Sequence, residues 1–198
     1  MDGDIAEELA DEPRAKTFPV GSEGIWTFVF IDMIVFLLIF FVFTTQRIDQ
    51  YSLYRDAHHH LSVIFGFANT IILLTSSLFV VRGVRAARAG IATKVMSQLQ
   101  FALGCGLLFF ASKAIEYYGK FAAGIGIATS SFFTFYFFIT FLHLLHLFGA
   151  VIFVIAYRRG ARDGVMDPRY VTGVENVGLF WHFVDLLWVF IFTLLYLM

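Results

Sequence analysis

Five long runs of apolar residues constrain this 198-residue chain more than any other feature. A helix that crosses the roughly 30 Å hydrocarbon core of a bilayer needs about 20 apolar residues. The predicted spans are residues 24–45, 62–81, 95–117, 131–157 and 177–197. A closed β-barrel would also satisfy every backbone group in lipid, but the runs lack the alternating pattern of barrel strands. The sequence therefore predicts an all-α polytopic membrane bundle with five transmembrane helices.

The rest of the chain predicts a simple organisation. Residues 1–22 are expected to form an acidic cytoplasmic tail, and residues 23–198 the membrane bundle. The chain is 59% hydrophobic, above the roughly 45–50% of soluble domains, so a soluble globular protein is excluded. The net charge of −1 provides no basic field for nucleic acid. The single cysteine, Cys105, excludes a disulfide framework or a cysteine metal cage.

Lysine and arginine are divided unequally between the two sets of connections. Ten flank one face of the bundle: Arg14, Lys16, Arg82, Arg85, Arg88, Lys94, Arg158, Arg159, Arg162 and Arg169. The opposite face has at most four: Arg47, Arg55, Lys113 and Lys120. Because cytoplasmic loops are enriched in Lys and Arg, we expect a cytoplasmic N-terminus and a periplasmic C-terminus.

Ionisable side chains within the spans need a reason, because a charge at the bilayer centre costs about 2.5–3.5 kcal/mol on insertion scales. At about 1.5 Å per residue, Asp32, His146, His182 and Asp185 fall at comparable depth in the cytoplasmic half. His143 lies one turn deeper, on the face of the helix that carries His146. The sequence predicts one buried polar cluster that joins the first, fourth and fifth spans.

Several roles remain open for these side chains. The cluster could supply interhelical hydrogen bonds, a lipid-headgroup or water-linked site, or a haem site with His146 and His182 as facing ligands. A proton-linked transporter would need an inverted repeat and broken helices, but all three prolines lie outside the spans. Lys113 and Glu116, spaced i, i+3 near the outer end of the third span, are expected to snorkel as an ion pair. The His58 to His60 run could hold a metal, although a solvated loop is favoured.

The fifth span carries a specific string. Glu175 is followed by WHFVD at residues 181–185 and by Trp188, which resembles the E-x5-WHFVD-x2-W signature of cytochrome c oxidase subunit III. Earlier segments resemble other motifs of that family in the same order, except that Phe141 and Ile31 replace small residues of the family pattern. The residues that carry the resemblance are Trp26, Asp32, Lys113, Glu116, His143, His146, Glu175, Trp181, His182, Asp185 and Trp188.

This resemblance implies a non-catalytic accessory subunit of a haem-copper respiratory complex in the bacterial inner membrane. In the family, the subunit packs on catalytic subunit I and other subunits and binds phospholipid between its helices. Haem and copper belong to a partner subunit, and this chain is expected to bind neither. Five spans match short bacterial branches that include quinol oxidase subunit III and a nitric-oxide-reductase-associated protein, and the arginine-rich second loop favours the latter. The alternative is a haem-binding or quinone-reacting membrane anchor that uses His146 and His182.

Overall fold

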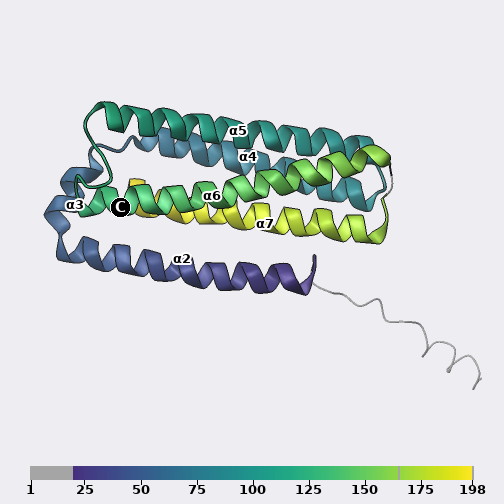
Figure 1. Cartoon of the computed structure of the whole chain (residues 1–198), viewed down its shortest axis with the longest axis horizontal. Helices are drawn as coiled ribbons and strands as arrows, with labels where there is room; N and C mark the ends of the chain where they lie inside the picture. Colours follow the sequence, from purple (N-terminus) through teal and green to yellow (C-terminus); the bar gives the residue numbers. More distant parts are fainter. Residues whose placement is uncertain (1–19, 165, 198) are drawn as a thin grey trace, which may run out of the picture.

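The computed structural model describes residues 20–164 and 166–197, and this part of the chain is almost entirely helical (Figure 1). Its long helices are α2 (Glu23–Asp49), α4 (Val63–Arg88), α5 (Ala92–Ala122), α6 (Ser131–Gly160) and α7 (Pro168–Phe192). Short elements are α3 (Tyr51–His58), the 3₁₀ turn η1 (Ala161–Asp163) and the π-helical turn η2 (Thr193–Leu197). Five helical segments are long and apolar enough to cross a membrane, which confirms the predicted all-α polytopic bundle.

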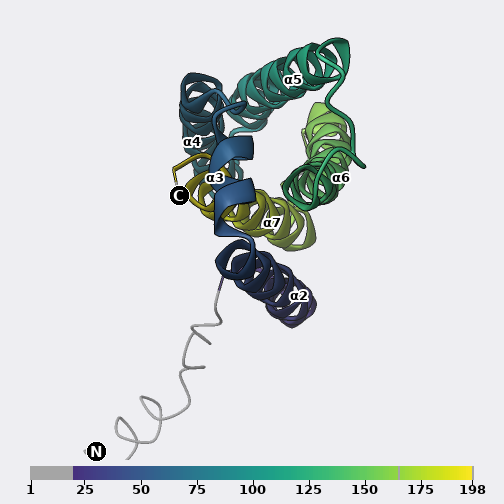
Figure 2. The same cartoon turned by 90° about the vertical axis from the view of Figure 1, so that its left-hand side faces the viewer.

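The helices form a group of four with one helix outside it. Figure 2 shows α4, α5, α6 and α7 around a common centre, with α2 on the outer side of α7. Only Phe36 and Phe43 of α2 are fully buried, whereas α7 buries about half of its length. Helix α2 therefore contributes little to the core and depends on a few specific contacts to hold its place.

The largest difference from the predicted boundaries is at the start of α7. This helix begins at Pro168 rather than at residue 177. The Asp167 side chain accepts a hydrogen bond from the Tyr170 N–H at 2.7 Å, and proline occupies the first turn; both features favour helix initiation. Helices α4 and α5 also extend beyond the predicted ends at residues 81 and 117. Hydropathy detects the membrane-crossing part of a helix, so it misses helical turns made of polar residues.

Helices α6 and α7 approach closely where Gly173 faces Tyr157. A Cβ atom on Gly173 would overlap the ring of Tyr157. The backbone of Tyr157 is also tied to α7, because the Tyr170 hydroxyl donates to its carbonyl at 2.7 Å. Only glycine therefore fits at this position without movement of the ring.

Gly173→Ala should lower the free energy of unfolding by about 1–3 kcal/mol, the usual cost of overpacking a close contact. Gly104→Ala is the matched control, because nothing lies within 4 Å of its Cβ position. Alanine is favoured over glycine in a helix by about 1 kcal/mol, so the control should be neutral or stabilising. Thermal unfolding in detergent compares the two variants. Equal melting temperatures would contradict the close contact.

Candidate functional site

The signature residues of α7 lie against α4 in a line of polar contacts. Trp181 Nε1 donates to Ser76 Oγ at 2.9 Å, and Trp188 Nε1 donates to Thr70 Oγ1 at 3.1 Å. Both tryptophans are fully buried. Small hydroxyl residues on α4 let the two helices approach and provide the acceptors that buried indole N–H groups need. The tryptophans of the signature therefore hold α7 on α4.

The predicted polar cluster separates into distinct sites. His182 Nδ1 lies 2.5 Å from Ser77 Oγ, which extends the α4–α7 contacts. Asp185 is 4% exposed, and neither carboxylate oxygen has a hydrogen-bond partner among the described residues. His143 is fully buried, and the centroid of its ring lies 5.3 Å from that of the Trp188 ring. Neither of its ring nitrogens has a hydrogen-bond partner among the described residues. Among the described members of the predicted cluster, only Asp32 and His146 form an ion pair with each other.

Asp32 and His146 form the contact between α2 and α6. His146 Nε2 lies 3.2 Å from Asp32 Oδ2, and each side chain is 16% exposed. The other ring nitrogen, Nδ1, lies 2.8 Å from the Leu142 carbonyl, which can only accept. The pair therefore attaches the peripheral helix α2 to α6.

Glu175 and its neighbour Asn176 fasten the start of α2 to α7. Glu175 Oε1 accepts from Arg88 Nε at 2.7 Å, and Oε2 accepts from the Gly21 N–H at 3.2 Å. The Asn176 side-chain oxygen accepts from the Ser22 N–H at 2.7 Å. Gly21 has a φ of 86°, a backbone conformation that favours glycine. Glu175 thus joins the end of α4, the start of α2 and the first turns of α7.

Glu175→Gln should loosen the segment before α2 by about 1 kcal/mol, the upper value for a partly exposed ion pair. Hydrogen exchange at the Gly21 and Ser22 amides should then accelerate about fivefold, while α7 stays protected. Asp163→Asn, an exposed carboxylate at the same end of the bundle, is the control and should leave these amides unchanged. An equal effect of the two variants would show that Glu175 acts only through its charge.

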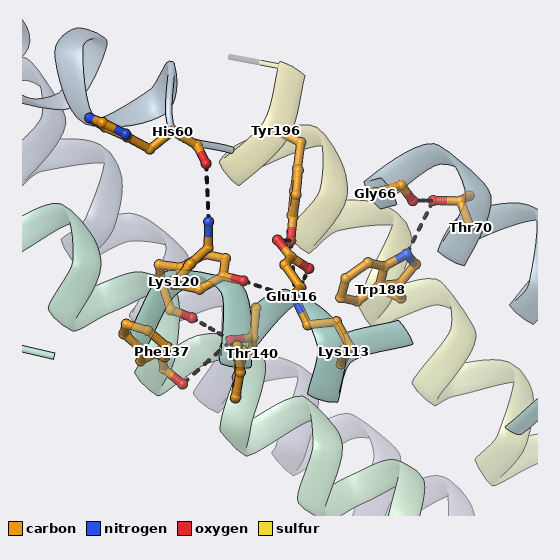
Figure 3. A network of polar contacts seen from close by, with 12 residues as sticks. His60, Gly66, Thr70, Lys113, Glu116, Lys120, Phe137, Thr140, Trp188 and Tyr196 are labelled. Atoms are coloured by element: carbon orange, nitrogen blue, oxygen red, sulfur yellow. Dashed lines mark hydrogen bonds and ion pairs between the residues drawn. The ribbon is translucent and has the colours of Figure 1, made fainter. Parts of the chain in front are cut away.

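Lys113 on α5 lies at the centre of a network of polar contacts (Figure 3). Its ammonium donates to Glu116 Oε2 at 2.7 Å, to the Tyr136 hydroxyl at 3.1 Å and to the Tyr196 hydroxyl at 3.0 Å. The Tyr196 hydroxyl donates in turn to Glu116 Oε1 at 2.7 Å. All three ammonium donors are therefore used, and the contacts connect α5 with α6 and η2.

Aromatic rings enclose the same ammonium. Its Nζ lies 5.0–5.7 Å from the centroids of four rings, a distance suited to cation–π attraction. These rings belong to Tyr117, Tyr136, Trp188 and Tyr196. The predicted ion pair between Lys113 and Glu116 is confirmed, but the Lys113 side chain is 1% exposed, so the expectation that it snorkels is wrong. The ammonium remains inside because α5 continues to Ala122 and neighbouring elements supply its partners.

The histidine run lies beside this network instead of forming an isolated loop. His58 Nε2 lies 2.8 Å from the Tyr196 carbonyl, so the prediction of a fully solvated run is wrong for this residue. The His60 carbonyl accepts from Lys120 Nζ at 3.1 Å. Among residues 20–164 and 166–197, no group of three or more His, Cys, Asp or Glu side chains is placed to hold a metal ion.

An apolar groove of about 680 Å³ runs between α2 and α7. Trp26, Phe30, Met33, Leu179, His182 and Leu186 are among the residues that line it. His182 is the ionisable side chain in this lining, and its Nδ1 is engaged by Ser77. The groove has the apolar walls that a hydrocarbon chain needs.

Comparisons with known proteins agree on one family. The family model described as cytochrome c oxidase subunit III matches residues 21–198. Cytochrome c oxidase subunit 3 of Corynebacterium diphtheriae is 29% identical over 178 residues, which cover 88% of this chain and 86% of that protein. The corresponding protein of Alkalihalophilus pseudofirmus is 28% identical and covers 98% and 96%. Cytochrome bo(3) ubiquinol oxidase subunit 3 of Buchnera aphidicola from Schizaphis graminum is 25% identical and covers 88% and 92%. The chain therefore belongs to the cytochrome c oxidase subunit III family.

Proposed function

We propose that this chain is a non-catalytic accessory subunit of a haem-copper respiratory oxidase. The family match across residues 21–198 carries the proposal. The geometry supports it, because Trp181, Trp188 and Glu175 are engaged in contacts between helices. In this proposal haem and copper reside in partner subunits, and electron transfer takes place there.

The same proposal includes an orientation and a location. Arg82, Arg85, Arg158 and Arg159 lie at the end of the bundle where α4 and α6 finish and α7 begins. Positively charged connections face the cytoplasm, so this end is cytoplasmic and the end that carries α3 is periplasmic. The membrane is then the bacterial inner membrane.

The proposed partner is the catalytic subunit, subunit I, together with other subunits of the complex. Helix α2 supports such an assembly, because it leaves large apolar side chains such as Phe30, Leu38 and Phe41 exposed along its length. Phospholipid acyl chains are the proposed occupants of the α2–α7 groove. The lipid would fill an apolar space beside His182, so that this polar group does not face an empty hydrocarbon gap.

Purification of the tagged chain in a mild detergent tests the proposal. We expect a large partner with a Soret absorption band to co-purify and to reduce oxygen. Isolation as a stable, colourless monomer with no haem-containing partner would overturn the proposal.

Nitric oxide reductase is the second candidate for the partner complex, because the short five-helix chain and its arginine-rich second loop resemble the branch associated with that enzyme. Turnover of the purified complex with nitric oxide but not with oxygen would favour it. A Soret band from the isolated chain would instead favour a haem-binding anchor. The structure gives His146 and His182 separate partners, Asp32 and Ser77, which does not support that anchor.

A further inference from the structure

Lys120 is a buried cation with an incomplete set of partners. It lies in the last turn of α5 and is 6% exposed. Its ammonium donates to the His60 carbonyl at 3.1 Å (Figure 3). It also lies 5.1 Å from the centroid of the Tyr136 ring. Within the described ranges, no carboxylate comes within ion-pair distance of it. Two of its three N–H donors therefore remain for another acceptor.

The neighbouring carboxylate, Glu116, already has a hydrogen-bond donor on each of its oxygens. Glu116 receives Lys113 on one oxygen and the Tyr196 hydroxyl on the other, both at 2.7 Å. Lys113 and Lys120 together carry two positive charges against the single negative charge of Glu116. A net positive charge of this kind is expensive in a low-dielectric setting unless an anion accompanies it.

A groove of about 350 Å³ leads to this charge between α4 and α5. Its lining combines the polar residues Lys120, Glu116 and His60 with the apolar residues Phe65, Ile115 and Ile125. Because α4 begins at Val63 and α5 ends at Ala122, this groove lies at the end of the bundle, at the level expected for lipid headgroups. The groove thus matches a molecule with an anionic head and a hydrocarbon chain.

We propose that this groove binds one phospholipid, whose phosphate accepts hydrogen bonds from the Lys120 ammonium. The apolar walls beside Ile115 and Phe65 favour a lipid over free phosphate, which would leave them unused. The site is separate from the α2–α7 groove and does not depend on the identity of the partner complex.

Native mass spectrometry of the full chain in detergent, titrated with phosphatidylglycerol, tests the site. Lys120→Met should weaken binding about tenfold, because it removes the charge and keeps the aliphatic stem. Arg55→Met is the matched control, because Arg55 lies at the same end of the bundle with its side chain 62% exposed, and it should leave binding unchanged. Diacylglycerol, which has the chains without the phosphate, should bind both variants equally.

Ile115→Glu is a second variant that tests the same lipid site if Lys120→Met fails to fold. Ile115 is 61% exposed on the groove wall, and a carboxylate there should repel the phosphate by a comparable factor. Ile64→Glu is its control, because Ile64 is 80% exposed outside the groove lining. Equal phosphatidylglycerol affinity in the wild type, Lys120→Met and Ile115→Glu would overturn the proposal. Displacement of the lipid by millimolar inorganic phosphate would overturn it too, by assigning the site to a free anion.

Discussion

Lys113→Met should lower the free energy of unfolding by about 3–5 kcal/mol, the typical cost of leaving one partner of a buried ion pair behind. The variant keeps the aliphatic stem but removes the cation that faces Glu116 Oε2 at 2.7 Å. The Glu116 carboxylate would retain the hydrogen bond from the Tyr196 hydroxyl but lose its cationic partner. It would also remain largely buried, at 9% exposure. Unfolding in mixed maltoside–dodecyl sulfate micelles measures the change.

The double variant Lys113→Met with Glu116→Gln separates pairing from packing. Removal of both charges should recover most of the lost stability, since replacement of a whole buried ion pair by neutral groups is often nearly neutral. Lys94→Met, at an exposed position near the start of α5, controls for the loss of one lysine. If Lys113→Met unfolds like Lys94→Met, the buried network does not stabilise the bundle.

The membrane helices could be predicted because hydropathy and length depend on local sequence alone. Each predicted span overlaps one of the five membrane-length helices. The start of α7 could not be predicted from hydropathy, because Arg169, Thr172, Glu175 and Asn176 interrupt the apolar residues of its first turns. Asp167 and Pro168 contained the missing signal: a capping residue followed by proline marks a helix start even where hydropathy is low.

The predicted polar cluster is confirmed only in part, because Asp32 and His146 meet whereas His182 contacts Ser77 instead. Counting residues estimates depth along a helix, but each residue also turns the side chain by about 100° around the axis. His146 faces α2 and meets Asp32, whereas His182 faces α4 and meets Ser77. The tilt and rotation of packed helices depend on contacts between distant segments. One sequence therefore predicts comparable depth without predicting partners.

The Lys113 network was missed because its members look unremarkable separately. Tyrosine near the end of a span is typical of an interfacial belt, and Lys113 with Glu116 is typical of a surface pair. Tyr136 and Tyr196 convert the pair into a buried network, and they come from different helical segments. A lysine–glutamate pair in one span, with tyrosines at the facing ends of others, was the available signal.

Trp188→Ala should cost about 3–5 kcal/mol, as expected for deletion of a fully buried tryptophan. Its ring lies 4.7 Å from the Phe109 ring and 5.4 Å from Lys113 Nζ, and its indole N–H reaches Thr70 at 3.1 Å. The substitution removes packing from α5, a donor to α4 and one wall of the aromatic cage. Trp188→Phe retains most of the ring, so it should cost closer to 1 kcal/mol, the typical net value of one hydrogen bond.

Trp26→Ala is the matched control for the same residue type on the outer helix. Trp26 is 43% exposed, and its indole donates only to the Val20 carbonyl at 2.9 Å. Its loss should therefore change the free energy of unfolding of the isolated chain by about 0.5 kcal/mol, as for an exposed position. A similar cost for the two tryptophans would contradict a core centred on α4 to α7. A small cost for Trp26 in the isolated chain but a large one in the assembled complex would instead locate a partner against α2, because only assembly would bury that ring.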